Sequence, residues 1–247
     1  MSKKFTVFFM LIVCILLSAG VQAVSADGIT VALHPDSKPF LYISDNNEIV
    51  GIDREVINAV AGTQGLDVKF VLMNFDEMID AAASCKVDAA ISSMTRTEER
   101  EEIALFSEPY FIASKVLFIK NNRTDIESIE SEGIKTIGVK GNSTSETTVI
   151  EYQGENNYEI RTFDEYPEMF KALENGEIDA AVTDDTLGKL FVDEYSDIVT
   201  VGAPISEEPY AIAVCPENPE LLETINAGLD EIRNNGMLDL IILDNMK

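Results

Sequence analysis

The chain has 247 residues, 46% of them hydrophobic, which is enough to bury one or two cores. It carries 18 Lys and Arg against 44 Asp and Glu, and the resulting net charge of −26 argues against nucleic acid and anionic membrane surfaces as partners. Most of this acid excess is expected on a solvated surface, and it does not define the charge of a pocket.

The first 26 residues have the pattern of a secretory signal peptide. Lys3 and Lys4 precede an apolar run over 7–17, and small residues follow, which fits cleavage after Ala23 or Ala26. The run is shorter than the ~20 residues that a membrane-spanning helix needs, so a retained anchor is the weaker alternative. Cleavage would remove two lysines and no acid, taking the net charge to −28. We therefore expect export, to the periplasm or the outer face of the cytoplasmic membrane.

Two cysteines, Cys85 and Cys215, follow this leader. They are too few for a disulfide scaffold and lack metal-ligand spacing, so we expect neither a metal ion nor a cofactor. Export permits the two to pair. Because free cysteines are often buried, we favour two separate, partly buried thiols.

Strand-like and helix-like segments alternate along the rest of the chain. In the first half the pattern predicts a strand over 29–33, a helix over 53–64, a strand over 68–73, a helix over 75–84, a strand over 87–92, a short helix carrying Arg100 and an extended segment over 111–119. Asp53 is the expected cap of the first helix and Gly65 its end, while Thr97 is the expected cap of the short helix.

The second half continues the alternation. It predicts strands over 136–139, 158–163, 178–183 and 198–201, helices from 143 and over 166–175, an extended run over 210–214, and a final helix over 219–235 that Gly236 ends. Strands alternating with helices indicate an α/β fold with mainly parallel sheets flanked by helices.

Two strand sequences are near copies, Val-Asp-Ala-Ala-Ile-Ser at 87–92 and Ile-Asp-Ala-Ala-Val-Thr at 178–183. The first leads on to Arg100, and the second ends at Asp184. In open α/β sheets, ligands bind beyond the carboxyl ends of the strands. A guanidinium near one strand end and a carboxylate at the other predict a clamp for a zwitterion.

A second pair of similar segments is Pro-Tyr-Phe-Ile-Ala at 109–113 and Pro-Tyr-Ala-Ile-Ala at 209–213. We interpret them as paired strands that cross between two lobes. The expected lobes are residues 27–112 with 210–247, and residues 113–209. A two-strand hinge of this kind is suited to closure around a ligand.

Five motifs in order carry a family resemblance: Gly51-Ile52-Asp53, Phe75-Asp76-Glu77-Met78-Ile79, Lys86-Val87-Asp88-Ala89-Ala90-Ile91, Met94 to Arg100 with Phe106-Ser107-Glu108-Pro109-Tyr110, and Asn235-Gly236-Met237-Leu238-Asp239. Together they resemble the extracellular solute-binding proteins, family 3, the polar amino acid type that serves ABC importers. The resemblance implies a two-lobed type II periplasmic binding protein fold. It also implies a monomeric, non-catalytic protein that captures an amino acid and delivers it to a membrane permease.

The resemblance also implies roles for first-lobe residues. Arg100 matches the residue that holds the ligand α-carboxylate, for which a planar fork of donors is well suited; the alternative is a surface ion pair with Glu101 or Glu102. Ser93 and Thr95 match residues that bind through backbone and hydroxyl groups.

In the second lobe, Ser143 and Thr144 stand at a predicted helix start, where backbone N–H groups attract an anion. They match residues that complete the carboxylate site, with Asn142 in place of the usual Gly. Asp184 matches the acid that accepts the α-ammonium group, and we expect it to be ionised. The alternative for Asp184 is a helix cap, a role we prefer for Asp185.

Two further candidates belong to the first lobe. Phe75 matches an aromatic that packs on the ligand, although an ordinary core position is the alternative. His34, the only histidine, and Ser37 stand where relatives often have Asp and Tyr, so a side-chain preference cannot be transferred. A solvated His34 is the alternative to a ligand contact.

Two other classes of function stay open. The first is an enzyme on the same scaffold, resembling a cyclohexadienyl or arogenate dehydratase, for which Glu146, Asp185 or His34 would have to supply a proton. The second is a ligand-sensing module that docks to a receptor.

Overall fold

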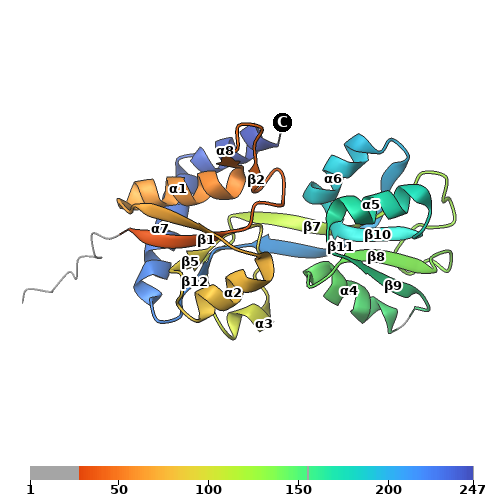
Figure 1. Ribbon diagram of the computed structural model, residues 1–247, viewed down its shortest axis with the longest axis horizontal. Helices are drawn as coiled ribbons and strands as arrows, with labels where there is room; N and C mark the ends of the chain where they lie inside the picture. Colours follow the sequence, from red (N-terminus) through yellow and green to blue (C-terminus); the bar gives the residue numbers. More distant parts are fainter. Residues whose placement is uncertain (1–27, 155, 247) are drawn as a thin grey trace, which may run out of the picture.

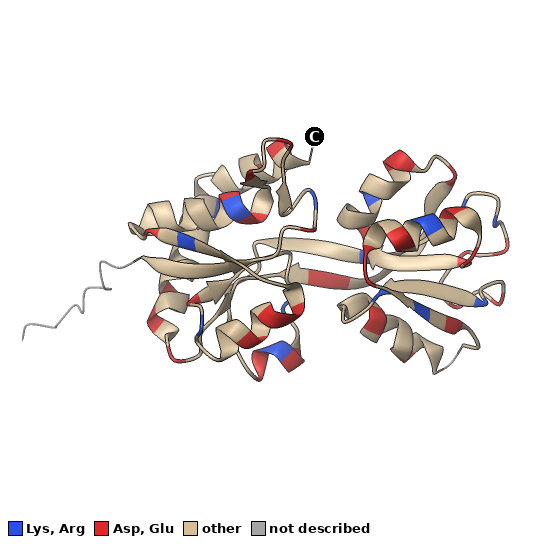
Figure 2. Ribbon diagram, viewed as in Figure 1, with Lys and Arg blue, Asp and Glu red and all other residues tan. Residues whose placement is uncertain are grey.

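The computed structural model describes residues 28–154 and 156–246 (Figure 1). The predicted signal peptide over 1–26 lies outside these residues. Within them, no helix combines the length and the apolar character needed to cross a membrane. Asp and Glu residues are spread over helices and loops of both halves of the molecule (Figure 2).

Lobe 1 is built on a five-stranded sheet with the strand order β4-β1-β5-β12-β6. The parallel strands are β4, β1 and β5, whereas β12 runs antiparallel to both β5 and β6. The strands of the lobe are β1 (Ile29–Leu33), β4 (Val68–Leu72), β5 (Ala89–Ala90), β6 (Leu105–Phe106) and β12 (Ala213–Val214), with a small hairpin of β2 (Tyr42–Ile43) and β3 (Ile49–Val50).

Helices cover both faces of this sheet, which confirms the predicted layering. The side chains of α1, α7 and α8 pack on one face with Val31 and Leu33, and those of α2 pack on the other with Ala32. The helices are α1 (Ile52–Gln64), α2 (Phe75–Ala83), α3 (Glu98–Glu101), α7 (Pro219–Asn234) and α8 (Met237–Asn245). Alternate residues of β1 therefore enter opposite cores, as the pleat of a strand requires.

Lobe 2 has a second five-stranded sheet with the order β11-β7-β10-β8-β9. Its strands are β7 (Phe111–Lys120), β8 (Thr136–Lys140), β9 (Glu159–Phe163), β10 (Ala180–Asp184) and β11 (Ile198–Tyr210), and its helices are α4 (Thr144–Gln153), α5 (Tyr166–Asn175) and α6 (Asp185–Glu194). The parallel strands are β10, β8 and β9, while β7 is antiparallel to β10 and to β11.

The long strands β7 and β11 connect the lobes (Figure 1). They pair antiparallel from Phe111 opposite Tyr210 to Lys120 opposite Ile198, with an irregularity between Val201 and Ser206. The predicted strand over 198–201 is confirmed but too short, because β11 continues to Tyr210, and the predicted extended run over 210–214 is divided between the end of β11 and β12. The predicted lobe boundaries, at 112/113 and 209/210, fall inside these two strands and stay a prediction.

The start of α1 differs from the prediction. Gly51, not Asp53, is the N-cap, and its φ of 121° is accessible to few other residues. Asp53 is fully buried instead, where its carboxylate accepts hydrogen bonds from the Ser93 N–H at 2.7 Å and from the Tyr110 hydroxyl at 2.6 Å. It therefore fixes the strand end that carries Ser93.

The chain ends in one more helix than predicted. The helix α7 stops at Asn234, and Gly236, in the left-handed conformation at φ 79°, is the N-cap of α8. Gly236 thus separates two helices rather than ending the last one.

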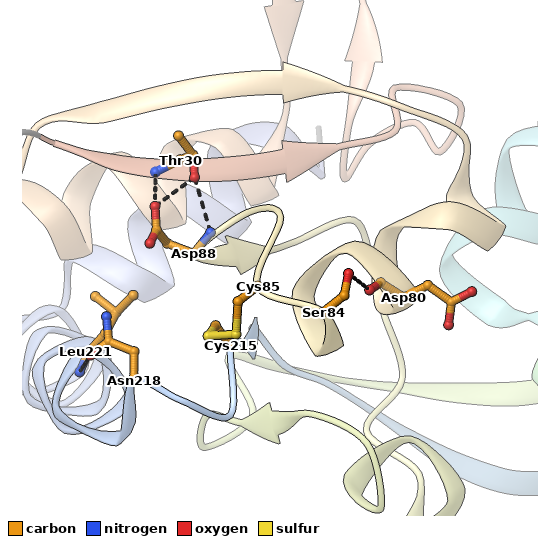
Figure 3. The surroundings of a disulfide bond; sticks show 8 residues. All are labelled: Thr30, Asp80, Ser84, Cys85, Asp88, Cys215, Asn218 and Leu221. Atoms are coloured by element: carbon orange, nitrogen blue, oxygen red, sulfur yellow. Dashed lines mark hydrogen bonds between the residues drawn. A yellow bond between two sulfur atoms is a disulfide. The ribbon is translucent and has the colours of Figure 1, made fainter.

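The expectation of two free thiols is wrong, because Cys85 and Cys215 form a disulfide (Figure 3). Antiparallel pairing of β12 with β5 aligns Val214 with Ala89. The Cys215 N–H then donates to the Asp88 carbonyl at 3.0 Å. The end of one strand thereby lies beside the loop that precedes the other, and this brings the two sulfurs together.

Candidate functional site

A cavity of about 290 Å³ lies between the lobes, and residues of both lobes line it. All eight residues predicted for the site line this cavity: His34, Phe75, Ser93, Thr95, Arg100, Ser143, Thr144 and Asp184. The two halves of the predicted clamp therefore face one space. Their roles as ligand contacts stay predictions.

Arg100 reaches the cavity from α3, whose cap Thr97 accepts the Arg100 N–H at 3.2 Å, as predicted. The guanidinium donates through Nη1 to the Thr95 carbonyl at 2.7 Å and lies 5.6 Å from the Phe75 ring centroid. Burial lowers the pKa of Arg100, but a guanidinium in a protein keeps its charge at neutral pH. The alternative ion pair with Glu101 is made by Arg96 instead, at 2.7 Å.

Ser93 and Thr95 lie where the chain leaves β5. Ser93 adopts a left-handed backbone at φ 40°, and its N–H is bound to Asp53. The Ser93 N–H is therefore occupied, and the hydroxyl and carbonyl of Ser93 are the groups that remain for a ligand. Its predicted role as a ligand contact stays a prediction. Thr95 is 6% exposed and forms an isolated antiparallel β-bridge with Tyr210, which places it beside the end of the hinge strand β11.

The start of α4 supplies the second-lobe wall. Ser143 is its N-cap, accepting from the Glu146 N–H at 3.3 Å and donating to the Lys140 carbonyl at 2.7 Å. Asn142 has φ 56°, the left-handed conformation expected at this position. The positive end of the α4 dipole therefore faces the cavity beside Thr144.

The Thr144 hydroxyl belongs to a buried network at the hinge. It accepts a hydrogen bond from Lys115 Nζ and donates to Glu208 Oε2, both at 3.0 Å. Lys115 and Glu208 also form an ion pair at 2.6 Å, with side-chain exposures of 0% and 5%. Burial acts to raise the pKa of Glu208, but the charge of Lys115 and the hydrogen bonds from Lys115, Ser206 and Thr95 together outweigh it, so the pKa is lowered.

Asp184 ends β10 and is 8% exposed. Its Oδ2 accepts a hydrogen bond from the Tyr210 hydroxyl, while Oδ1 has no hydrogen-bond partner among the described residues. Burial raises the pKa of Asp184 to about 6, against the opposing effects of Tyr210 and Lys115. The carboxyl therefore titrates near pH 6, in a buried setting. Asp184 is also the N-cap of α6, without a side-chain cap hydrogen bond.

His34 is held by two hydrogen-bond partners, and its side chain is 24% exposed. Its Nδ1 lies 3.0 Å from the Met73 carbonyl oxygen and its Nε2 lies 3.1 Å from Asp36 Oδ2. The hydrogen bond with Asp36 raises the pKa of His34. Its ring also lies edge-on to Phe75, with 6.4 Å between centroids, so both side chains line one wall.

An ion pair that spans the cavity was not predicted from the sequence. Lys140 Nζ from lobe 2 lies 2.7 Å from Asp36 Oδ2 of lobe 1 and 5.0 Å from the Tyr166 ring centroid. Nearby, the Asn142 amide donates to Asp76 at 3.2 Å. Asp36 lies between His34 and Ser37 in the sequence, but no sequence pattern indicated that Lys140 would contact it.

Comparisons with known proteins agree with this architecture. The model of the bacterial extracellular solute-binding proteins, family 3, matches residues 29–244. The "ABC transporter glutamine-binding protein GlnH" of Bacillus subtilis (strain 168) is 32% identical over 221 residues, covering 87% of this chain and 80% of its own. The "Arginine-binding periplasmic protein" of Mannheimia haemolytica is 30% identical over 211 residues, covering 83% and 86%.

Solved structures have the same fold. An ancestral arginine-binding protein bound to arginine superposes with a TM-score of 0.80 at 35% identity, covering 89% of this chain and 98% of its own. The ancestral amino acid-binding protein AncCDT-1, a precursor of cyclohexadienyl dehydratase, gives a TM-score of 0.79 at 29% identity, with coverages of 89% and 96%.

Proposed function

Because the chain belongs to the bacterial extracellular solute-binding proteins, family 3, we propose that it captures an amino acid in the cavity between its lobes. It acts outside the cytoplasmic membrane, as a monomer, and delivers its ligand to the permease of an ABC importer. Relatives named for binding arginine and glutamine support the ligand class, and a relative named as part of an ABC transporter supports the delivery role.

The observation that carries the proposal is the environment of Asp184. A buried carboxylate oxygen without a hydrogen-bond partner is costly unless a ligand supplies one. An ammonium group is a suitable partner, because it offers three donors and a positive charge. Asp184 is the acceptor of the ligand α-ammonium group in this proposal.

The α-carboxylate of the ligand lies at Arg100 and the start of α4. Nη1 of Arg100 is held by the Thr95 carbonyl, which orients the remaining donors of the fork. The α4 dipole adds a positive potential from the opposite lobe. A ligand that contacts both lobes favours the closed arrangement over an open one, since only the closed form makes both sets of contacts.

The role is one of binding without catalysis. The dehydratase alternative draws support from the similarity to AncCDT-1, but that protein is itself named as an amino acid-binding precursor. Incubation with cyclohexadienyl substrates tests the alternative directly: we expect no turnover, and any product formation that depends on the protein would favour the enzyme.

The main test is Arg100→Ala, measured by calorimetric titration with the common amino acids. We expect loss of detectable binding, because a charge-assisted carboxylate contact contributes about 1.5–3 kcal/mol and a buried ligand carboxylate would be left unpaired. Arg96→Ala is the matched control, since Arg96 lies four residues away in an exposed ion pair with Glu101. Unchanged affinity in Arg100→Ala would remove this residue from the site.

A further inference from the structure

Two tyrosines at the hinge occupy equivalent positions, because each follows the proline of one of the two similar hinge segments. They are neighbours in space, since the Tyr110 N–H donates to the Tyr210 carbonyl at 2.9 Å. Each hydroxyl donates to a buried aspartate: Tyr110 to Asp53 Oδ1 at 2.6 Å, and Tyr210 to Asp184 Oδ2. The repeat in the sequence therefore corresponds to a repeated tyrosine–aspartate pair, with one aspartate in each lobe.

The two pairs differ in what they leave for a ligand. Asp53 accepts from Tyr110 with one oxygen and from the Ser93 N–H with the other, and it does not line the cavity. Asp184 lines the cavity, and its Oδ1 has no hydrogen-bond partner in the part of the chain that the structure describes. The first pair is complete within the protein, whereas the second lacks one partner where the ligand ammonium group is proposed to bind.

The Tyr210 side chain is held firmly. It is fully buried, and its ring centroid lies 5.0 Å from that of Phe40 and 5.9 Å from that of Phe111. A side chain that is packed in this way keeps one rotamer, so its hydroxyl donates from a fixed position.

The backbone around Tyr210 is attached to lobe 1. Tyr210 forms a β-bridge with Thr95, and next to it the Arg96 N–H donates to the Pro209 carbonyl at 2.8 Å. The Tyr210 hydroxyl reaches Asp184 of lobe 2 from this position. Tyr210 therefore connects the acid of lobe 2 to the turn of lobe 1 that carries Thr95.

We propose, building on the proposed function, that Tyr210 is a positioning residue for the ligand ammonium group. Its hydroxyl holds one oxygen of Asp184 and thereby directs the other oxygen to the ligand. Tyr210 does not itself line the cavity, so it acts through Asp184. A hydrogen bond to the charged form of a carboxyl also favours ionisation. Tyr210 thus keeps Asp184 charged at a lower pH than burial alone would allow.

The alternative is that Tyr210 only fills the hinge and satisfies its own hydroxyl. Tyr158 is a residue of that kind, because it is buried in lobe 2 and its hydroxyl donates to the Val149 carbonyl at 2.9 Å. Neither Tyr158 nor Val149 lines the cavity. Tyr158→Phe therefore removes the same atom from the same lobe, at a site that a ligand does not depend on.

The test is Tyr210→Phe, measured by calorimetric titration with the common amino acid that the wild type binds most tightly. At about pH 8 we expect affinity to fall by about three- to tenfold, the range of one hydrogen bond. We also expect the acid fall in affinity to begin about half a unit to one unit higher in pH, since Asp184 loses a donor that favours its charged form.

Other groups also act on the charge of Asp184, and Tyr210→Phe leaves each of them in place. They are Lys115, Glu208, Asp185 and Tyr166. A shift in the acid fall can therefore be attributed to the lost hydroxyl.

A second variant keeps the hydroxyl and changes its strength. Replacement of Tyr210 by 3-fluorotyrosine makes the phenol a stronger donor, so the acid fall should move to lower pH. This variant also serves if Tyr210→Phe does not fold. Carbon-13 NMR titration of the Asp184 carboxyl in the ligand-free proteins should give the same order, with the highest pKa of Asp184 in Tyr210→Phe.

The proposal is overturned if Tyr210→Phe changes the affinity and its pH dependence no more than Tyr158→Phe does. It is also overturned if the pKa of Asp184 is the same in the wild type and in both Tyr210 variants. In these cases the proposed function stands, since the wild type still binds an amino acid. A wild type that binds no amino acid would instead refute the proposed function, while the NMR titration would still test the contact between Tyr210 and Asp184.

Discussion

Two carboxylates that line the cavity, Asp36 and Asp184, differ in their surroundings. Asp36 is held by His34 and Lys140, and these hydrogen bonds keep its pKa well below the usual range despite burial. Asp184 has one neutral donor, Tyr210, and burial dominates, raising its pKa to about 6. The first is a permanently charged member of an ion pair, whereas the second changes charge within the physiological range.

Ligand affinity should therefore depend on pH through Asp184. A bound ammonium favours the ionised carboxyl and lowers its pKa in the complex, so binding below pH 6 releases a proton. We expect affinity to be constant above about pH 7 and to fall by up to about tenfold per unit below pH 6. Titration in buffers of different ionisation enthalpy measures the proton directly.

The control is His34→Asn. His34 also lines the cavity and its pKa is raised, so its titration is a second source of pH dependence that this variant removes. We expect the acid fall in affinity to persist in this variant. The stability of the ligand-free protein depends on pH in the opposite direction, because a carboxyl whose pKa is raised on folding binds its proton more readily in the folded state. Its contribution to the free energy of unfolding should increase as pH falls from 6 toward 4. A pH-independent affinity would contradict the assignment.

At the residue scale, the sequence predicted which side chains line one cavity, but not the burial, hydrogen bonds or charge of each side chain. Arg100 and Asp184 follow equivalent strand ends, so the rule for open sheets placed both at one cavity. The Asp36–Lys140 pair joins residues from different lobes, and no local pattern encodes such a contact. The bound N–H of Ser93 likewise depends on Asp53, 40 residues earlier.

At the scale of elements, the disulfide joins the turn after α2 to the end of β12 (Figure 3). Beside it, Asp88 accepts hydrogen bonds from the Thr30 N–H at 2.7 Å and from its hydroxyl at 2.6 Å, which attaches the start of β5 to β1. The covalent bond and these hydrogen bonds therefore fix three neighbouring strands of lobe 1 at one end of the sheet.

Removing this bond should destabilise the protein without changing what it binds. For Cys85→Ser/Cys215→Ser we expect the free energy of unfolding to fall by roughly 2–5 kcal/mol, because the unfolded chain gains freedom. Urea unfolding measures the loss, and a reductant should lower the stability of the wild type but not of the variant. Neither cysteine lines the cavity, so a large change in amino acid affinity would contradict this separation of roles.

Most elements were predictable because strong periodic patterns and end signals coincide. The strand over 29–33 and the helix over 166–175 have the predicted bounds. The failures come from signals with two meanings. Glycine in the left-handed conformation commonly ends a helix. Here Gly236 has this conformation but is the N-cap of α8. The disulfide depends on the antiparallel pairing of β12 with β5, which the spacing of cysteines does not reveal.

At the scale of the whole molecule, a buried ion pair lies where the lobes join. Lys115 is on β7, Glu208 is on β11, and Thr144 of α4 is hydrogen-bonded to both. The pair thus lies between the two crossing strands and α4, whose Thr144 lines the cavity. It holds these three elements in one arrangement.

Breaking the pair on one side should be more damaging than removing it entirely. In Glu208→Gln the Lys115 ammonium stays buried without its counter-ion, and we expect a loss of about 3–5 kcal/mol in the free energy of unfolding. The double variant Lys115→Met/Glu208→Gln should recover part of this loss. Chemical denaturation compares the three proteins, and a Glu208→Gln variant as stable as the wild type would show that the pair is not structurally required.

The disulfide also encloses a long stretch of chain, since 130 positions separate its two cysteines and all of β7 to β11 lie between them. The disulfide therefore closes a covalent loop that contains these strands. If the segment between the two cysteines unfolded, the disulfide would still hold the two ends of this segment together. The chain would then have fewer conformations to search before the two ends pair again. Local opening of this segment is therefore followed by refolding more readily than by complete unfolding.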